Sequence, residues 1–313
     1  MKKLQIIFED SDILVIDKPA GLVVNRSSSQ VETLQDLVAS YLSLPTTDYR
    51  LQQYKKLSAI GLQTTTADSG ELNAFSQRSG IVHRIDPTSP RLRGASKLLV
   101  EGQMPNVADE FIQRAGIVHR IDKETSGLIL AAKNEKSFEK LQAQFAKREV
   151  EKEYLCLCHG MIGKDRGEIA GAIGRLGSGK FGILEGGREA VTKYEVIDNF
   201  KFPISNFDKI IYGFGKKLKA FFEKEAGDYT YLRVYPKTGR THQIRVHLKS
   251  INHPVVSDPL YLGRRLAKFD AKFCPRLFLH ASRIKFTHPR DGKKVEFISS
   301  LPDDLQKVLI KLK

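Results

Sequence analysis

The sequence predicts an α+β protein in which strands predominate. Apolar or alternating runs of strand length recur along the chain, sustained helical periodicity is confined to a few short segments, and the two do not alternate as in a βαβ protein. The chain has 313 residues, of which 41% are hydrophobic and 28% charged. This composition supports a full-sized core and excludes disordered, collagen-like and coiled-coil proteins.

The N-terminal segment predicts three strands and a helix. The strands are Leu4–Phe8, Ile13–Ile16 and Leu22–Val24, and residues 18–21 form a tight turn in which proline fixes φ and glycine frees it. A short amphipathic helix follows a polar link. Its apolar face consists of Leu34, Leu37, Val38 and Tyr41.

The middle of the chain predicts a buried strand and a capped helix. Leu128–Ala132 is an apolar run of strand length, and Asn134 is placed to cap the next helix. Phe138, Leu141 and Phe145 share one face of that helix. Further strands are expected at Glu153–Leu157, Ala190–Ile197 and Tyr229–Tyr235, and in short pieces between 276 and 297.

Two helices are expected in the last third of the chain. Thr241 is a plausible N-cap for a helix at Gln243–Ser250, and Ile244 and Leu248, four residues apart, face inward together. A basic helix at Asp303–Lys313 ends the chain.

Two segments have the character of insertions in a single domain that spans residues 1–313. Residues 46–109 are rich in polar residues and glycine and show no periodicity. Residues 201–228 predict a solvated amphipathic helix in preference to a direct RNA contact. Lysines surround a pair of phenylalanines in this second insertion: Lys216, Lys217, Lys219 and Lys224 around Phe221 and Phe222.

A twelve-residue block occurs twice. Phe75–Asp86 recurs as Phe111–Asp122, 36 residues later, with ten of twelve positions identical. A solenoid would repeat its whole period at least three times, so we interpret the block as a local duplication with one working copy. Pro87 and Pro90 follow the first copy, whereas residues 123–127 and an apolar run follow the second.

The charge favours a polyanionic partner. The formal net charge is +15, for which nucleic acid is the leading partner, although a basic ribosome-associated chaperone, a membrane-surface protein or a secreted cationic protein would show the same balance. The N-terminus lacks a signal-peptide pattern and the apolar runs are too short to span a bilayer, so no membrane association is expected. Cys156, Cys158 and Cys274 do not form a disulfide framework, which fits a reducing cytoplasm, and we interpret them as buried thiols in preference to zinc ligands.

Two polar segments could carry chemistry. His119-Arg120-Ile121-Asp122 places a carboxylate before a turn, where it is either a cap or a catalytic group. Residues 237–247 place several cations, including Arg240 and His242, at a turn and helix start where they could hold phosphates. Arg245 lies on the inward face of that helix and needs a carboxylate partner, for which Asp122 is the candidate.

Six blocks in this order resemble the motif series of the RluA-type pseudouridine synthases. They are Asp17–Gly21, Gly116–Gly127, Glu151–Tyr154, Thr238–Leu248, Ser257–Tyr261 and Leu279–Ala281. The resemblance implies the pseudouridine synthase fold, a mixed and mainly antiparallel bent sheet with flanking helices and a central RNA-binding cleft. It covers the chain apart from the two insertions and the extreme C-terminus, and no S4-like domain precedes it.

The resemblance also implies roles for single residues. Asp122 matches the catalytic aspartate, which acts as nucleophile at C1′ or as base at C2′, and Arg245 would lower its pKa and orient it. Tyr154 matches the tyrosine that stacks on the base and helps remove the C5 proton. Arg120 would fill the gap left by the flipped nucleotide, and Ile244 would form the floor under the uracil. The remaining substrate-binding candidates are His119, Arg240 and His242; His242 is also expected, with Asp258 and His280, to hold the loops that frame the cleft.

The resulting expectation is a cytoplasmic, monomeric RNA isomerase that acts on ribosomal or transfer RNA without a cofactor or metal. Two other classes stay open at this stage. A non-catalytic RNA-binding protein built on a degenerate synthase would not hold Asp122 and Arg245 within ion-pair distance. A metal-dependent hydrolase would need at least three ligands converging on one ion.

Overall fold

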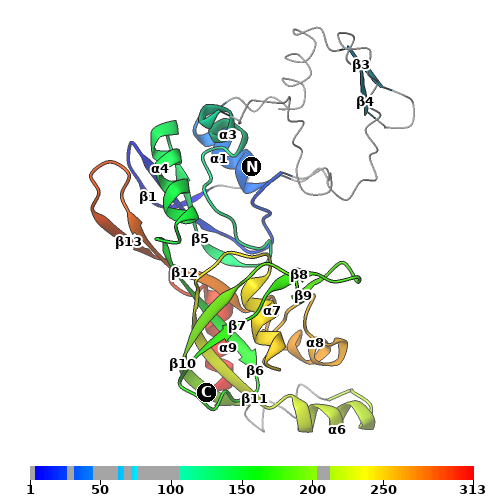
Figure 1. The fold of residues 1–313 in the computed structure, drawn as a ribbon. Helices are drawn as coiled ribbons and strands as arrows, with labels where there is room; N and C mark the ends of the chain where they lie inside the picture. Colours follow the sequence, from blue (N-terminus) through cyan, green and yellow to red (C-terminus); the bar gives the residue numbers. More distant parts are fainter. Residues whose placement is uncertain (1–3, 27–31, 45–62, 67–71, 76–105, 203–211) are drawn as a thin grey trace.

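The computed structural model describes residues 4–26, 32–44, 63–66, 72–75, 106–202 and 212–313 (Figure 1). Most of the first insertion, and with it Asp86 and all but the first residue of the first copy of the duplicated block, lies outside the described residues.

Within these residues one nine-stranded sheet organises the fold. Its order is β1-β2-β5-β12-β6-β11-β10-β7, and β13 pairs with β12. All neighbours are antiparallel except β5 and β12. The strands are β1 (Gln5–Glu9), β2 (Ile13–Lys18), β5 (Ser126–Ala132), β6 (Glu151–His159), β7 (Arg166–Ala170), β10 (Val191–Lys201), β11 (Asp228–Pro236), β12 (Leu279–Thr287) and β13 (Lys294–Ile298). Two separate hairpins pair β3 (Gln63–Thr66) with β4 (Leu72–Phe75) and β8 (Ile173–Arg175) with β9 (Phe181–Ile183).

Helices cover the two ends of this sheet. In Figure 1 the half with β1 and β5 carries α1 (Leu34–Tyr41), α3 (Val107–Gln113) and α4 (Glu135–Ala146). The half with β6, β11, β10 and β7 carries α6 (Lys216–Glu225), α7 (Gln243–Ser250), α8 (Arg264–Asp270) and α9 (Asp303–Leu312). The predicted α+β class with a mainly antiparallel sheet is confirmed.

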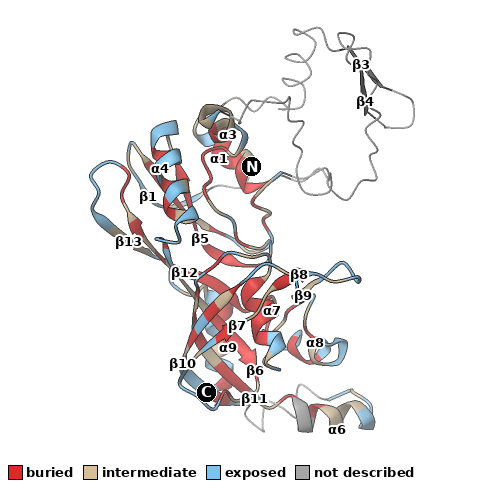
Figure 2. Ribbon diagram, in the orientation of Figure 1, coloured by how far each residue is buried: buried red, intermediate tan, exposed pale blue. Residues whose placement is uncertain are grey.

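The halves meet at a short parallel contact. Strands β5 and β12 pair only through His280 with Ser126 and Ala281 with Gly127. The His280 ring bonds the Ser126 hydroxyl (3.0 Å) through Nδ1 and the Ser299 carbonyl (3.1 Å) through Nε2. Each half has its own apolar core, as the buried residues of Figure 2 show.

Most predicted elements are present, and three differ. Leu22–Val24 is not a strand: Leu22 and Val24 are buried, but the carbonyls of Val23 and Val24 accept the N–H groups of Leu34 and Gln35 at the start of α1. This segment therefore satisfies its backbone at a helix N-terminus, whose first N–H groups have no partner within the helix.

The other two differences concern helices. Helix α3 begins at Val107, inside the region that showed no periodicity, with Asn106 accepting the Ala108 N–H as N-cap. Tyr41, expected on the apolar face of α1, is exposed, and its hydroxyl donates to Glu9 (2.6 Å).

The second insertion contains the expected amphipathic helix. On α6 Lys216 and Lys217 are exposed, whereas Phe222 is fully buried and packs against Phe269 of α8 with ring centroids 5.1 Å apart. The aromatic side chains thus dock the insertion on the body of the protein.

We predict that Gly127→Ala destabilises the protein by about 2–4 kcal/mol, because the parallel contact has no room for a side chain. Gly127 has φ of +111°, and a Cβ there would lie 2.3 Å from the Ala281 carbonyl oxygen. Gly163→Ala, where a Cβ meets no atom within 4 Å, is the control and should change stability by less than about 0.5 kcal/mol. Urea unfolding measures both; equal effects would contradict this account of the junction.

Candidate active site

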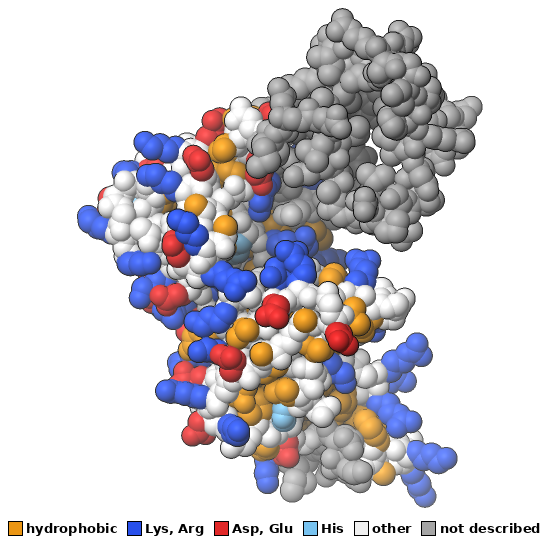
Figure 3. Space-filling view, viewed as in Figure 1, with side chains coloured by type: hydrophobic (Ala, Val, Ile, Leu, Met, Phe, Trp, Pro, Cys, Tyr) orange, Lys and Arg blue, Asp and Glu red, His pale blue; other side chains and the backbone are white. Residues whose placement is uncertain are grey.

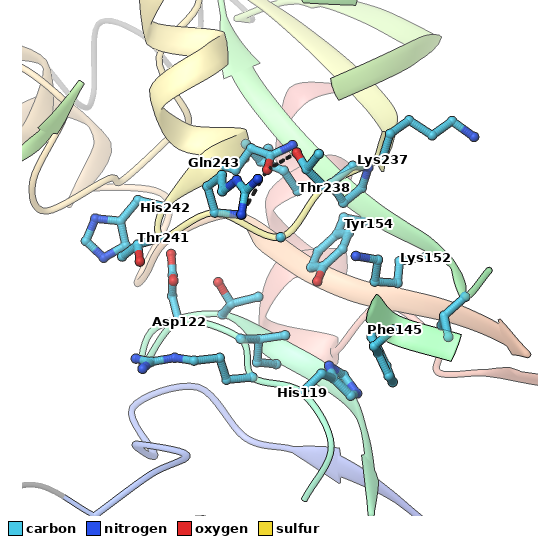
Figure 4. A pocket seen from close by; sticks show the side chains of 18 of the residues that line it. His119, Asp122, Phe145, Lys152, Tyr154, Lys237, Thr238, Thr241, His242 and Gln243 are labelled. Atoms are coloured by element: carbon cyan, nitrogen blue, oxygen red, sulfur yellow. Dashed lines mark hydrogen bonds between the residues drawn. The ribbon is translucent and has the colours of Figure 1, made fainter. Parts of the chain in front are cut away.

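A cavity of about 440 Å³ opens between the two halves. It is lined by all eight residues that the sequence singled out: His119, Arg120, Asp122, Tyr154, Arg240, His242, Ile244 and Arg245. In Figure 4 Asp122 and Tyr154 point into the same space from different elements. The structure therefore brings the predicted site residues together.

Asp122 lies on an irregular segment, not on a strand. Ile117 makes one bridge to Ala131, and the chain then runs without regular structure to the turn at Lys123 and Glu124. The turn is fixed because the Lys123 carbonyl accepts the Gly21 N–H (2.9 Å) and the Lys18 ammonium (3.0 Å).

Lys18 is a fully buried anchor that sequence reasoning missed. Its ammonium also donates to the carbonyls of Pro19 and Leu22, each at 2.9 Å. Burial lowers its pKa to about 7, although the charges of Glu124 and Asp122 oppose this. A lysine at the end of an apolar strand was the available signal, but of the three carbonyls that hold it the one of Lys123 lies 105 residues away in the sequence.

Helix α7 presents Arg245 to the cavity. Its N-cap is His242, with a left-handed φ of +56°, and not Thr241 as expected. No side chain caps this helix; Gln243 instead holds the turn before it. Its Oε1 accepts the Arg240 N–H (3.0 Å) and the Thr238 hydroxyl (2.6 Å), and its Nε2 donates to the Val191 carbonyl (3.0 Å). This buried amide ties the turn, the helix and β10 together.

Arg245 bridges two carboxylates. Its Nη1 lies 2.9 Å from Asp122 Oδ2, while Nε and Nη2 bind Asp258 at 2.7 and 2.8 Å. Burial lowers the pKa of Arg245, but the bonds and charges of Asp258 and Asp122 outweigh it and raise the pKa above its ordinary value. The pairing of Arg245 with Asp122 is confirmed. The second partner, Asp258, was expected only to hold a loop.

The Asp258 loop is itself held rigidly. Asp258 Oδ1 also accepts the N–H groups of Leu260 (2.8 Å) and Tyr261 (2.9 Å). The Tyr261 hydroxyl lies 2.9 Å from His242 Nδ1, and the guanidinium of Arg245 lies over the Tyr261 ring at 5.0 Å. His242 and Asp258 thus frame the cavity wall.

Tyr154 and Ile244 are among the apolar residues that line the cavity. Tyr154 lies on β6 between Val234 and Ala281 of the neighbouring strands. Burial and the charge of Asp122 raise the pKa of Tyr154, so the phenol is neutral at neutral pH. Ile244 is buried on the first turn of α7.

His119 is held by backbone. Its Nε2 accepts the Leu130 N–H (2.9 Å), and its ring stacks on Phe145 with centroids 4.9 Å apart. Burial, with the charges of Lys152 and Arg114, lowers its pKa to about 3. The ring is therefore neutral at physiological pH and carries its proton on Nδ1.

Cations without carboxylate partners line the rest of the cavity. Within the described part of the chain, Arg120 and Lys152 form no ion pair, and Arg120 is exposed. Burial lowers the pKa of Lys152 to about 8. Figure 3 shows Lys and Arg side chains gathered across this face.

The two other function classes find no support in this geometry. The 2.9 Å contact of Asp122 with Arg245 is the ion pair that the degenerate-synthase hypothesis did not expect. Among the described residues no three His, Cys, Asp or Glu side chains are grouped to hold a metal ion, and the three cysteines are buried and unpaired. No helix in the described ranges is long and apolar enough to cross a membrane.

Several known proteins are similar to this chain in sequence. Residues 94–250 match the family described as RNA pseudouridylate synthase. The chain is 34% identical to the uncharacterized RNA pseudouridine synthase YlyB of Bacillus subtilis, over 99% of this chain and 73% of that protein. It is 31% identical to the ribosomal large subunit pseudouridine synthase D of Pseudomonas aeruginosa, over 96% and 69%.

A solved structure agrees on the fold. Human RNA Pseudouridylate Synthase Domain Containing 1 aligns with 96% of this chain and 84% of its own, with a TM-score of 0.55 and 21% identity. The predicted pseudouridine synthase fold is confirmed.

We predict that Asp258→Ala destabilises the protein more than Asp122→Ala does. The Asp258 side chain is fully buried, so its loss leaves a buried guanidinium short of its main partner, at a cost of about 3–5 kcal/mol. The Asp122 side chain is 21% exposed and Arg245 keeps Asp258, so the cost there is about 1–2 kcal/mol. Urea unfolding of both variants tests the order, and a reversed order would refute it.

We predict that Lys152→Met stabilises the protein at pH 7 by about 1–2 kcal/mol, allowing for solvent screening, because it removes an unpaired, partly desolvated cation. The pKa of Lys152 falls from an ordinary 10.5 to about 8 on folding. Its cost is therefore complete below pH 8, declines as the pH rises towards 10.5, and is absent above. Unfolding measured from pH 7 to 10.5 tests this; a gain that does not decline would contradict it.

Proposed function

The chain belongs to the RluA-type RNA pseudouridine synthases, and from this premise we propose that it isomerises specific uridines in ribosomal RNA with Asp122 as the catalytic residue. The observation that carries the proposal is the Asp122 carboxylate at the cavity, held 2.9 Å from a buried arginine. Ribosomal RNA is favoured over transfer RNA because the named relatives of known target are ribosomal large subunit enzymes.

The reaction requires one carboxylate and no net exchange of atoms with another molecule. The N1–C1′ bond of uridine breaks, the uracil turns, C5 bonds to C1′, C5 loses its proton and N1 gains one. Asp122 serves either by attacking C1′ and being displaced by C5, or by taking the C2′ proton and later returning it. Both routes need the ionised carboxylate, which accepts a charge-assisted bond from Arg245.

Arg245 also fixes where that carboxylate points. Its other two bonds go to Asp258, so the guanidinium is immobile and Asp122 is held against a rigid partner. Such preorganisation lowers the cost of reaching the reactive geometry.

Tyr154 and Ile244 would hold the uracil. An aromatic ring beside an isoleucine gives a slot in which a flipped base can stack and turn. Because the pKa of Tyr154 is raised, its phenol stays protonated, so we infer that it relays the C5 proton and does not act as a phenolate base.

Arg120 would occupy the gap that the flipped nucleotide leaves in the RNA. Arg120 is exposed beside Asp122, where a planar cation can stack on bases and occupy the space of the flipped nucleotide. His119 supports this segment from beneath, through its bond to β5.

We predict that Asp122→Ala abolishes isomerisation, whereas Asp86→Ala retains most of it, because only the second copy of the block continues into the turn and strand of the site. The measurement is tritium release from 5-tritiated uridine in ribosomal RNA, with transfer RNA as the comparison substrate. Equal loss in both variants would refute the assignment of Asp122, and release from transfer RNA alone would refute the assignment of the substrate.

A further inference from the structure

A group of cations that do not pair with Asp122 or Asp258 lies along one side of the cavity. It consists of Lys152 on β6, Arg148 after α4, Arg240 in the turn before α7 and Arg188 before β10. Lys152, Arg148 and Arg240 line the cavity itself. Arg188 adjoins Glu189, whose carbonyl accepts the Arg240 Nε–H (3.1 Å), so it belongs to the same rim. We name these four residues the cationic rim.

No member of the cationic rim is neutralised by the protein. Within the described residues none of the four forms an ion pair. Other arginines of the chain are paired with carboxylates: Arg276 with Asp304, Arg283 with Glu153 and Glu296, and Arg245 with two aspartates. The rim therefore has charge that the folded chain leaves available.

The members of the rim also repel one another. Burial, with the charges of Arg188 and Arg148, lowers the pKa of Arg240. Burial does the same for Lys152, whose surroundings hold no compensating carboxylate. Gathering like charges at a cavity mouth costs stability in the free protein, and a bound polyanion removes that cost.

Backbone geometry fixes the positions from which these side chains extend. Arg148 adopts a left-handed φ of +62° directly after the last turn of α4, and its N–H donates to the Phe145 carbonyl (3.2 Å). Arg188 exchanges two backbone bonds with Ile173, each at 2.9 Å. Arg240 is held through its Nε, which leaves its terminal nitrogens free to donate.

The rim runs from the interior of the cavity to the surface. Lys152 and Arg240 are half-buried, whereas Arg148 and Arg188 are exposed. An RNA strand with one nucleotide in the cavity has its adjoining phosphates along such a path, and guanidinium groups bind phosphate oxygens with two parallel hydrogen bonds.

We propose that the cationic rim binds consecutive backbone phosphates of the RNA strand that carries the target uridine, with Lys152 on the phosphate nearest the flipped nucleotide. The proposal rests on the proposed function, since it takes the uridine-containing strand as the ligand. It assigns Arg148, Arg188 and Lys152 to RNA binding in addition to the residues that the sequence motifs indicated.

The test is the salt dependence of RNA binding. The double variant Arg148→Gln/Arg188→Gln is compared with Arg264→Gln/Lys268→Gln, which removes the same charge from exposed, unpaired positions on α8. Binding of a fluorescein-labelled RNA hairpin with a uridine-containing loop is followed by anisotropy between about 50 and 200 mM KCl. Unfolding curves of both variants confirm that the fold is intact.

The plot of log affinity against log salt has a negative slope, and the rim variant should make it shallower by about 1.5, at roughly 0.7–0.9 for each lost phosphate contact. The same variant should weaken binding on the order of tenfold. The α8 variant should change the slope by less than about 0.5. Adding Lys152→Met to the rim variant should make the slope shallower by a further ~0.8.

A rim variant with the slope of the α8 variant, or a wild-type protein that does not bind the hairpin, would overturn the proposal. Because this readout needs no turnover, it is separable from the proposed function. An active enzyme with an unchanged slope refutes only the rim, and a protein that binds through the rim but makes no pseudouridine refutes only the isomerase.

Discussion

The buried guanidinium of Arg245 is the interaction on which the site depends. It binds Asp258 with two bonds and Asp122 with one, and these two carboxylates come from different halves of the molecule. A guanidinium that is 3% exposed would cost several kcal/mol without a carboxylate partner, so the fully buried Asp258 is the partner that folding requires. The contact of Asp122 with the same guanidinium then joins the catalytic candidate of one half to the core of the other.

The surrounding contacts serve that arrangement. Gln243 fixes the turn before α7. Lys18 joins the turn that follows Asp122, through the Lys123 carbonyl, to the N-terminal turn, through the carbonyls of Pro19 and Leu22. The Lys18 ammonium is held by main-chain carbonyls, and the Gln243 amide is held by main-chain atoms together with the Thr238 hydroxyl. Both side chains therefore have their hydrogen bonds satisfied inside the protein. The cationic rim differs from these groups, because within the described residues none of its four charges is paired with a carboxylate. Paired charges thus build the site, and unpaired charges are available to RNA at some cost in stability.

The residues that the sequence singled out line one cavity, but several of their contacts were not predicted. The ordered motifs singled out Asp122, Tyr154 and Arg245, and the need of a buried arginine for a carboxylate predicted the Asp122 contact. The bidentate contact with Asp258 was missed because it depends on the loop at Ser257, whose φ is +56° and whose N–H is held by Asp270 (2.6 Å). Leu22–Val24 was wrong because its carbonyls bind the N-terminus of α1, about ten residues on, and not a neighbouring strand. The threonine cap of α7 was wrong because the left-handed backbone of His242 moves the N-cap one residue on. The rim could not be found from motifs, since its four residues come from four separate segments.

The central claim is that this chain converts uridines of ribosomal RNA to pseudouridine through Asp122. The most direct measurement maps pseudouridines across the ribosomal RNA of cells that carry the wild-type gene, a deletion or the Asp122→Ala allele expressed at the same level. The account predicts that the same small set of pseudouridines disappears in the deletion and in the Asp122→Ala cells, and that the wild-type gene restores it. The account would be contradicted if the deletion cells kept every ribosomal pseudouridine, or if the Asp122→Ala allele restored the pseudouridines that the deletion removes.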